Sequence, residues 1–406
     1  MTFDVAFARS LFPQLADGFA YFDNAGGTLV PASVPRRMAA FMTECQVQPK
    51  GAYGPSAEAA RRLDEAKLRM AELIGAEADE IVLGHSTTMN VYVLSHAVRA
   101  GLKPGDEVIV TNADHEANNG AWRRLAEAGA VVKEWRVHPD TAELELEDLR
   151  VLLTERTRLV AATHCSNVTG SFNDLAAIAA LAHAAGAIVV ADGVAGAPHR
   201  SVDVKALGVD VYLCSLYKIY GPHHAMMYVR RDLMRRLKGQ NHFFIGEDSL
   251  PLKLNVGGYD YEVVGSLTGI ADYVSALHGH MFPGTNRPFA QQVKPVMDAA
   301  GAHETATVKP LHDFLSAKKG VRLIGRKSGA ARAPVFAFAV EGRDASEFPP
   351  ILAAKKLGLL SGHYYAYRLI DAVGLLPRGG VVRASLAHYN TAEEVDRLIR
   401  ALDEAI

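Results

Sequence analysis

Ala-Ile-Val-Val-Ala-Asp-Gly at residues 187–193 and Val-Tyr-Leu-Cys-Ser-Leu-Tyr-Lys-Ile-Tyr-Gly-Pro at residues 211–222 decide the fold. Each stretch begins with a short apolar run typical of a buried strand and leads to a charged residue. Gly221-Pro222 prevents a helix from following directly, so Lys218 is expected in a turn just beyond a strand. Open α/β sheets bind ligands at the carboxyl ends of their strands. Asp192 and Lys218 are therefore the first candidates for a functional site.

Both residues also have an ordinary structural explanation. A lysine after a strand is most often solvated, and an aspartate there often caps the next turn through backbone N–H groups. The sequence has no lysine or arginine between Arg158 and Arg200, and a carboxylate at the edge of a dry sheet is costly unless a cation balances it. A protonated ring nitrogen of a cofactor would meet that need as well as a cap would. The two residues alone leave both explanations open.

Short apolar runs alternate with helical segments over most of the chain. The helical pattern of residues 56–74 ends at Gly75, a strand-like run follows, and the alternation then repeats. Strands alternating with helices predict an α/β fold with a mainly parallel sheet covered on both faces. The strand-like runs are Ile81–Leu83, Val108–Val110, Val131–Val132, Leu159–Ala162, Ile188–Val190 and Val211–Leu213.

The pattern changes after about Gly284. Strand-like runs at residues 321–324, 335–338 and 380–385 are combined with helical patterns at residues 346–357 and 391–406, which predicts a smaller α+β domain. A chain of 406 residues exceeds the size at which one hydrophobic core keeps growing, so two domains are expected. We assign residues 21–284 to the large domain and residues 1–20 plus 285–406 to the small domain.

A further candidate segment, Gly84-His-Ser-Thr-Thr88, lies between a predicted strand and the predicted helix Met89–Val98. Its hydroxyl groups and free backbone N–H groups would lie at a helix N-terminus, where the helix dipole favours an anion such as phosphate. Ser and Thr are also common N-cap residues, so this segment alone is a weak signal.

These candidates belong to a series of motifs that runs from Tyr21-Phe-Asp-Asn24 to the last helix. The later members are Gly84-His-Ser86-Thr87-Thr88, Asp114-His115-Glu-Ala-Asn118, His164-Cys-Ser-Asn167-Val-Thr-Gly170, Ala191-Asp192-Gly193, Ser215-x-x-Lys218 and Val382-Arg383-Ala-Ser-Leu-Ala-His-Tyr-Asn390. In this order they resemble the class V aminotransferase family of fold type I pyridoxal-phosphate enzymes, most closely its cysteine desulfurase branch. The resemblance implies a large pyridoxal-phosphate domain with a seven-stranded type of sheet, a smaller C-terminal domain, and a homodimer with shared active sites.

The resemblance also implies a role for each motif. Lys218 would bind pyridoxal 5'-phosphate covalently and then take the α-proton from an amino acid held as an external aldimine. Asp192 would hold the ring nitrogen, and His115 would lie flat on the ring, although a lone histidine is more often structural. The expected substrate contacts are Arg383, which would grip the carboxylate, with Asn167, Asn24 and Tyr365. The expected cofactor contacts are Ser86, Thr87, Thr88, His115, Asn167, Asp192, Ser215, Tyr217 and Lys218.

The sequence departs from the desulfurase pattern in places that bear on the reaction. Tyr365 stands where the resemblance implies a cysteine that attacks substrate sulfur, and a phenol cannot store a persulfide. Ala195 replaces a glutamine expected near the ring hydroxyl, Tyr217 replaces a histidine, and Gly258 stands near an expected threonine. The cysteines, Cys45, Cys165 and Cys214, are expected to be small core residues rather than nucleophiles.

Several reactions remain open at this point. We favour a carbon–sulfur lyase that begins with loss of the α-proton and forms no persulfide. A class V aminotransferase, an amino-acid epimerase and a non-catalytic pyridoxal-phosphate-binding protein are the alternatives, because each would use the same lysine, aspartate and carboxylate clamp. A serine hydrolase with a Ser-x-x-Lys helix is disfavoured because Gly221-Pro222 forbids that helix.

Composition narrows the range of partners. With 43 basic and 45 acidic side chains, the chain has no general charge to attract nucleic acid or anionic lipid. The uncharged stretch Leu175–Ala191 is interrupted by His183 and Gly186, which predicts a helix and a strand rather than a membrane span. Histidine pairs such as His223-His224 lack further ligands at convincing spacing, so no metal is expected. Three dispersed cysteines favour a reducing compartment, hence the cytoplasm.

Overall fold

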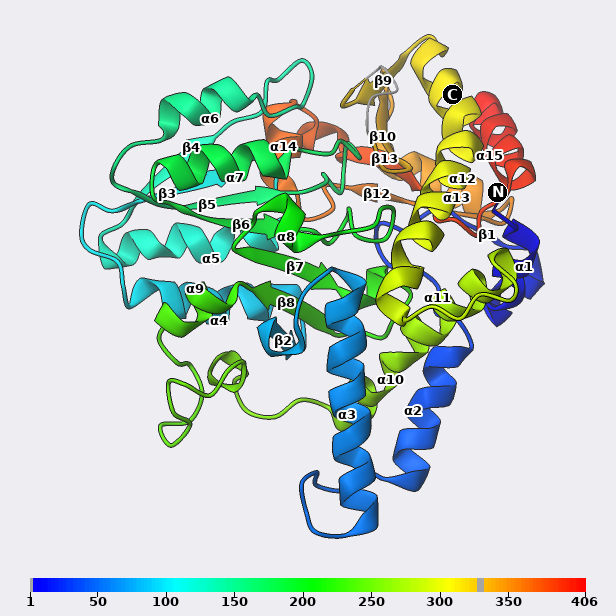
Figure 1. The fold of residues 1–406 in the computed structure, drawn as a ribbon. Helices are drawn as coiled ribbons and strands as arrows, with labels where there is room; N and C mark the ends of the chain where they lie inside the picture. Colours follow the sequence, from blue (N-terminus) through cyan, green and yellow to red (C-terminus); the bar gives the residue numbers. More distant parts are fainter. Residues whose placement is uncertain (1–2, 327–331) are drawn as a thin grey trace.

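A seven-stranded sheet forms the centre of the computed structural model, which describes residues 3–326 and 332–406 (Figure 1). Its strand order is β2-β8-β7-β6-β5-β3-β4, and all neighbours are parallel except that β8 runs antiparallel to both β2 and β7. The strands are β2 (Ile81–Gly84), β3 (Glu107–Thr111), β4 (Val131–Trp135), β5 (Thr157–Thr163), β6 (Ile188–Asp192), β7 (Val211–Ser215) and β8 (Ala225–Val229).

The predicted α/β fold with a mainly parallel sheet is confirmed. Each of the strand-like runs identified before residue 214 lies within one of the strands. The sequence analysis missed β8, whose residues Ala-Met-Met-Tyr-Val directly follow Gly-Pro-His-His. This run contains one β-branched residue and two methionines, so it lacks the composition that usually marks a strand.

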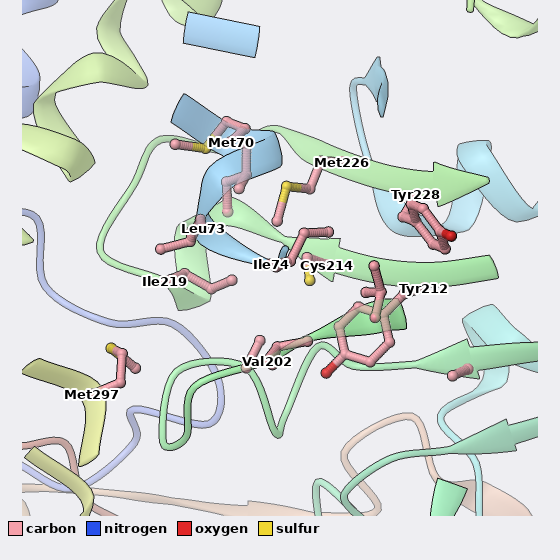
Figure 2. Packing of buried hydrophobic residues seen from close by; sticks show 14 of the residues in the cluster. Met70, Leu73, Ile74, Val202, Tyr212, Cys214, Ile219, Met226, Tyr228 and Met297 are labelled. Atoms are coloured by element: carbon pink, nitrogen blue, oxygen red, sulfur yellow. The ribbon is translucent and has the colours of Figure 1, made fainter. Parts of the chain in front are cut away.

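Apolar side chains alternate between the two faces of the sheet, and helices cover both faces. On β7, Tyr212 and Cys214 face the core that includes α3 (Gly54–Leu73) and α7 (Leu175–Ala184), and Figure 2 shows them with Met226 and Tyr228 of β8. Val211 and Leu213 face the other core, which includes α4 (Thr87–Arg99), α5 (Gly120–Arg123) and α9 (Arg231–Arg236). Burial on both faces fixes the strand positions, as is typical of parallel sheets.

A four-stranded antiparallel sheet lies beside the large sheet (Figure 1). It has the order β12-β13-β10-β9 and packs against α12 (Phe289–Ala317) and α15 (Ala392–Ala405) through a separate apolar core. Its strands are β9 (Val321–Ile324), β10 (Val335–Val340), β12 (Leu360–Gly362) and β13 (Val381–Ser385). These elements are those expected of an α+β unit, while the division at residue 284 stays a prediction.

One predicted helix is shorter than expected. Instead of extending over residues 346–357, helix α13 covers Phe348–Ala353, and β11 (Leu357–Gly358) then pairs in parallel with β1 (Ala20–Tyr21). Lys356 adopts a positive φ of 57°, which ends the helical path and turns the chain into β11. The pairing partner lies more than 300 residues away along the chain, so local sequence did not predict it.

The other elements connect these two parts. None of the helices in the described ranges combines the length and apolar character needed to cross a lipid bilayer. The remaining α-helices are α1 (Val5–Ser10), α2 (Ser33–Glu44), α6 (Leu146–Leu152), α8 (Val204–Leu207), α10 (Tyr261–Ser266), α11 (Thr268–Met281) and α14 (Tyr367–Ala372).

We predict that a methyl group at Gly269 destabilises the contact between α11 and α2. A Cβ atom at Gly269 would lie 2.6 Å from the Cα atom of Val34, and backbone cannot move aside cheaply. Gly269→Ala is expected to lower the free energy of unfolding by about 1–3 kcal/mol, measured by urea denaturation.

Gly279 on the same helix provides the matched control, since a Cβ atom there would meet nothing within 4 Å. Gly279→Ala should leave stability unchanged or raise it by up to about 1 kcal/mol through higher helix propensity. Equal stability of the two variants would show that the α2–α11 contact is looser than described.

Candidate active site

Lys218 lies at the carboxyl edge of the large sheet, in the 3-10 turn Leu216–Lys218 that follows β7. Lys218 is only 6% exposed, whereas most lysine side chains are in contact with solvent. Burial lowers the pKa of its ammonium group to about 8, and nearby Arg383 acts in the same direction, while Asp192 and Asp23 partly oppose them. A nucleophilic amine has to be neutral, and an amine with this pKa is neutral in part of the molecules near physiological pH.

Asp192 ends the neighbouring strand β6 and is also buried. Its Oδ1 atom accepts a hydrogen bond of 2.9 Å from the backbone N–H of Val194, so the capping explanation holds in part. Burial nevertheless raises the pKa of the carboxyl group, and the Lys218 ammonium offsets this only incompletely. A cation at this carboxylate would therefore be strongly favoured.

His115 follows β3 and is held in a fixed orientation. Its Nδ1 atom accepts a hydrogen bond of 3.1 Å from the backbone N–H of Ala117. Burial lowers its pKa to about 3, and the positive charges of Lys218 and Arg383 act in the same direction. The imidazole is therefore neutral, as suits a ring that stacks on another ring. The preceding Asp114 is fully buried and binds Thr111 and Asn118, which anchors this segment to β3.

Two hydroxyl groups from distant parts of the chain meet at the N-terminus of α4. Thr87 Oγ1 lies 2.7 Å from Ser215 Oγ, and both residues are buried. Ser86 caps the helix, with its Oγ accepting a hydrogen bond of 3.2 Å from the Met89 N–H. The hydroxyl pair, the N–H groups of the first turn and the helix dipole together favour a phosphate group.

One cavity joins these groups. It is lined by every residue that the sequence analysis assigned to the cofactor: Ser86, Thr87, Thr88, His115, Asn167, Asp192, Ser215, Tyr217 and Lys218. Ala117, Thr163, Cys165, Val194 and Ala195 complete the lining. The structure thus brings the predicted residues together from the ends of five strands, although it does not test the role of each.

Arg383 lies on β13 in the small sheet and reaches toward the same region. One of its terminal nitrogens forms a 2.6 Å ion pair with Asp23, and the other donates a 3.0 Å hydrogen bond to the carbonyl oxygen of Asn167. Its Nε atom is buried without a partner among the described residues. The guanidinium plane lies 3.8 Å from the ring centre of Tyr364. Arg383 is therefore fixed in place and retains a free donor.

The loop between β12 and α14 carries Tyr364 and Tyr365 with positive φ angles of 49° and 58°. Such angles are uncommon for residues other than glycine and cluster at functional sites. Tyr365 is 68% exposed, and its ring centre lies 5.2 Å from that of His115. Its carbonyl oxygen accepts a 2.8 Å hydrogen bond from the Glu116 N–H. The Tyr365 ring therefore lies beside His115, outside the residues that line the cavity, and its role as a substrate contact stays a prediction.

Asn24 is not placed among the residues that line the cavity. Its amide nitrogen donates to the carbonyl oxygens of Tyr21 and Ser385 at 3.0 Å each, and its oxygen accepts from Tyr389. These bonds tie the N-terminal segment to the small sheet, so Asn24 has a structural task. The sequence analysis overlooked its neighbour Asp23, although an acidic residue directly after the apolar Tyr21-Phe22 was a usable signal.

The cavity fits pyridoxal 5'-phosphate. The buried carboxyl group of Asp192 lacks a full cationic partner within the described chain, and the protonated pyridine nitrogen of the cofactor would supply one. The hydroxyl pair of Thr87 and Ser215 suits the phosphate, and the Lys218 amine suits the aldehyde. The residues present thus match the three polar ends of this cofactor.

The chain matches the Aminotransferase class-V family model over residues 20–273 and 291–398. It belongs to this family. Its members use pyridoxal 5'-phosphate, so the chain is a pyridoxal-phosphate-dependent enzyme, as the sequence motifs predicted.

The relatives of this class V enzyme carry more than one functional description. It is 37% identical to the aminotransferase-like protein FGM3 of Gibberella zeae, over 99% of this chain and 98% of that protein. It is 32% identical to the cysteine desulfurase-like protein ustD of Aspergillus flavus, over 99% and 91% of the two chains. The cysteine desulfurase CsdA of Escherichia coli matches the fold with a TM-score of 0.83 at 28% identity, covering 100% of this chain and 99% of that one.

We predict that Lys218 is the residue that binds the cofactor covalently. Borohydride reduction of the protein with pyridoxal 5'-phosphate should fix the cofactor to the wild type, and peptide mass spectrometry should find it on Lys218. The pKa of this lysine lies at about 8, and only the neutral amine attacks the aldehyde. The initial rate of cofactor attachment to the apoprotein should therefore rise with pH through about 8 and level off above it.

Two variants of Lys218 distinguish a covalent bond to the cofactor from attraction by the positive charge of the side chain. Lys218→Ala removes the amine, and Lys218→Arg keeps a positive charge but cannot condense with the aldehyde; both should lose the reduced adduct. Lys205→Ala, on the exposed surface, should retain it. Reduced cofactor on another lysine of Lys218→Ala, at wild-type yield, would refute the assignment.

Proposed function

We propose that this enzyme removes the α-proton of an amino acid and releases its product without forming a protein persulfide, most simply as a carbon–sulfur lyase. The observation that carries the proposal is the combination of a buried, low-pKa Lys218 beside Asp192 with Tyr365 at the place where a desulfurase-like enzyme needs its cysteine. These residues support proton transfer by Lys218 and argue against sulfur transfer through a cysteine.

The proposed roles follow from the positions of the side chains. The cofactor, when bound, supplies a ring that withdraws electrons from the substrate's α-carbon. With the cofactor bound, Asp192 would hold the ring nitrogen protonated, Thr87 and Ser215 would hold the phosphate, and neutral His115 would face the ring. Lys218 lines the cavity and would act as the base that takes the α-proton at its Nζ atom.

Arg383 is proposed to bind the substrate carboxylate. Its side chain is buried and preorganised by Asn167 and by the Tyr364 ring, so little entropy is lost when a carboxylate docks. Its unpartnered Nε atom and the nitrogen now held by Asp23 offer a two-pronged contact. A carboxylate anchored there would fix the orientation of the substrate in the cavity.

No cysteine of the chain is suited to carry sulfur. Cys165 lines the cavity, but burial raises the pKa of its thiol to about 12, and its Sγ atom donates to the carbonyl oxygen of Gly170 at 3.3 Å. Burial also raises the thiol pKa of Cys45 and of Cys214. The nucleophile of persulfide chemistry is a thiolate, and each of these thiols stays protonated.

Transamination is the second candidate, because a relative of 37% identity is described as aminotransferase-like and the same Lys218 and Arg383 would serve it. Epimerisation and cofactor binding without turnover are alternatives that the same side chains allow. The four differ in their products, and so a product assay separates them.

We predict that a screen of amino acids against the cofactor-loaded enzyme finds a substrate whose product leaves no persulfide on the protein. Absorbance changes identify the amino acid, and product analysis then distinguishes sulfide, keto acid and inverted isomer. If cysteine or a related thiol is the substrate, Cys165→Ala should keep at least about half of the wild-type rate, because that thiol is protonated.

Mass spectrometry of the intact protein during turnover provides the control. An added sulfur atom on any cysteine, lost together with activity in Cys165→Ala, would contradict a reaction without persulfide. A keto acid as the main product, with the cofactor left as its amine, would show that the enzyme is an aminotransferase and not a lyase.

We further propose a homodimer whose contact includes residues 238–260. Phe243 is 98% exposed and Phe244 is 68% exposed in this segment, which extends from the body of the fold between α9 and α10 (Figure 1). Exposed aromatic residues of this size mark protein contacts.

We predict a dimeric mass in sedimentation experiments, and a shift toward the monomer in the double variant Phe243→Ser, Phe244→Ser. Val151→Ser removes an equally exposed apolar residue from α6, at 77% exposure, and should remain dimeric. A wild-type monomer would rule the dimer out.

The cytoplasm is the proposed location, because free, buried cysteines such as Cys45 are typical of reducing compartments.

A further inference from the structure

His224 is a buried side chain that does not line the active-site cavity. It directly precedes β8 and is 1% exposed. Neither of its ring nitrogens has a hydrogen-bond partner among the residues that the structure describes. A buried polar group left unpaired costs free energy, and most buried imidazoles are paired. The position therefore calls for a ligand of the imidazole.

The register of β2 and β8 places a second histidine beside it. Gly84, the last residue of β2, pairs with Ala225, the first residue of β8. Because these strands are antiparallel, the residues just beyond this pair, His85 and His224, lie next to each other at the same edge of the sheet. Their ring centres are 6.0 Å apart and their planes cross at 78°.

An acidic residue completes the group. Asp260 occupies the N-cap position of α10, yet its side chain makes no capping hydrogen bond. Its Oδ2 atom instead lies 3.5 Å from Nδ1 of His85. One potential ligand atom from each of His85, His224 and Asp260 lies within 4.8 Å of the other two.

We propose that His85, His224 and Asp260 bind a divalent transition-metal ion, with Zn²⁺ as the ion that fits best. A set of two imidazole nitrogens and one carboxylate oxygen favours Zn²⁺ over Mg²⁺ or Ca²⁺, which bind mainly oxygen ligands. Water takes the fourth position of the tetrahedron. Chain spacing gave no hint of the group, because its members come from three loops that only the fold brings together.

The distances allow such a site with small side-chain rotations. Ligand atoms around a tetrahedral zinc ion lie about 3.3 Å from one another, and His85 and Asp260 at 3.5 Å already meet this spacing. His224 is fixed by burial, whereas the side chains of His85 and Asp260 are each 52% exposed. The two exposed side chains can therefore close on the fixed one.

The ion would connect three segments that border the active site. His85 directly precedes Ser86, the cap of α4, while His224 precedes β8 and Asp260 begins α10. An ion bound there would hold the Ser86–Thr88 turn against the sheet edge and add positive charge beside its N–H groups. The inference does not depend on which reaction the enzyme catalyses.

Zinc binding to the untagged, full-length, cofactor-loaded protein tests the proposal. After dialysis against a chelator, equilibrium dialysis with Zn²⁺ should show one tightly bound ion per chain, and Co²⁺ should give the visible absorption of a tetrahedral site. Zn²⁺ should also raise the melting temperature, because an ion that binds only the folded state stabilises it.

His85→Ala and Asp260→Asn, both at exposed positions, should fold and weaken Zn²⁺ binding at least about tenfold, since the loss of even an outer partner of a metal ligand costs that much. His138→Ala, an exposed histidine elsewhere on the surface, should bind Zn²⁺ like the wild type. Failure of the wild type to bind Zn²⁺ or Co²⁺, or equal binding by all three variants, would overturn the proposal.

Discussion

The burial of the Lys218 amine between two strand ends is the constraint on which the active site depends. Removing the ammonium group from water favours its neutral form, while Asp192 and Asp23 keep the opposing charge close enough to limit that effect. The balance holds only because β6 and β7 cannot shift, since their apolar side chains are packed on both faces of the sheet. The chemistry of one nitrogen atom thus rests on the packing of the whole large sheet.

The sheet edge gathers side chains that lie far apart in the sequence. The parallel strands β2, β3, β5, β6 and β7 all deliver a polar residue to the same edge, where the Ser86–Thr88 turn, His115 and Lys218 meet in one cavity. The antiparallel strand β8 starts at that edge, and so its first neighbour, His224, lies there as well. Arg383 comes from the other sheet, which makes the site dependent on how the two sheets pack.

The sequence predicted those parts of the fold and site that depend on local pattern. Apolar runs located most strands of the large sheet, and all the residues that the motifs assigned to the cofactor line the cavity. Features set by pairing between distant segments were not predictable in this way. The strand β11 depends on β1, the ion pair of Arg383 depends on Asp23, and His85 meets His224 only through the register of β2 and β8. The task of Asn24 likewise follows from contacts with the far end of the chain.

The ion pair between Asp23 and Arg383 has a consequence for the proposed role of Arg383, because Asp23 would compete with the substrate carboxylate for the guanidinium group. Because Asp23 is tethered beside the guanidinium, a carboxylate that binds as proposed would have to displace a competitor present at high effective concentration. The apparent affinity of Arg383 for a carboxylate would be reduced in proportion to the fraction of time that Arg383 is free of Asp23. In the absence of a substrate, Arg383 keeps Asp23 as a partner for its positive charge. Under the proposed role, an amine without an acidic group would have no group with which to replace Asp23.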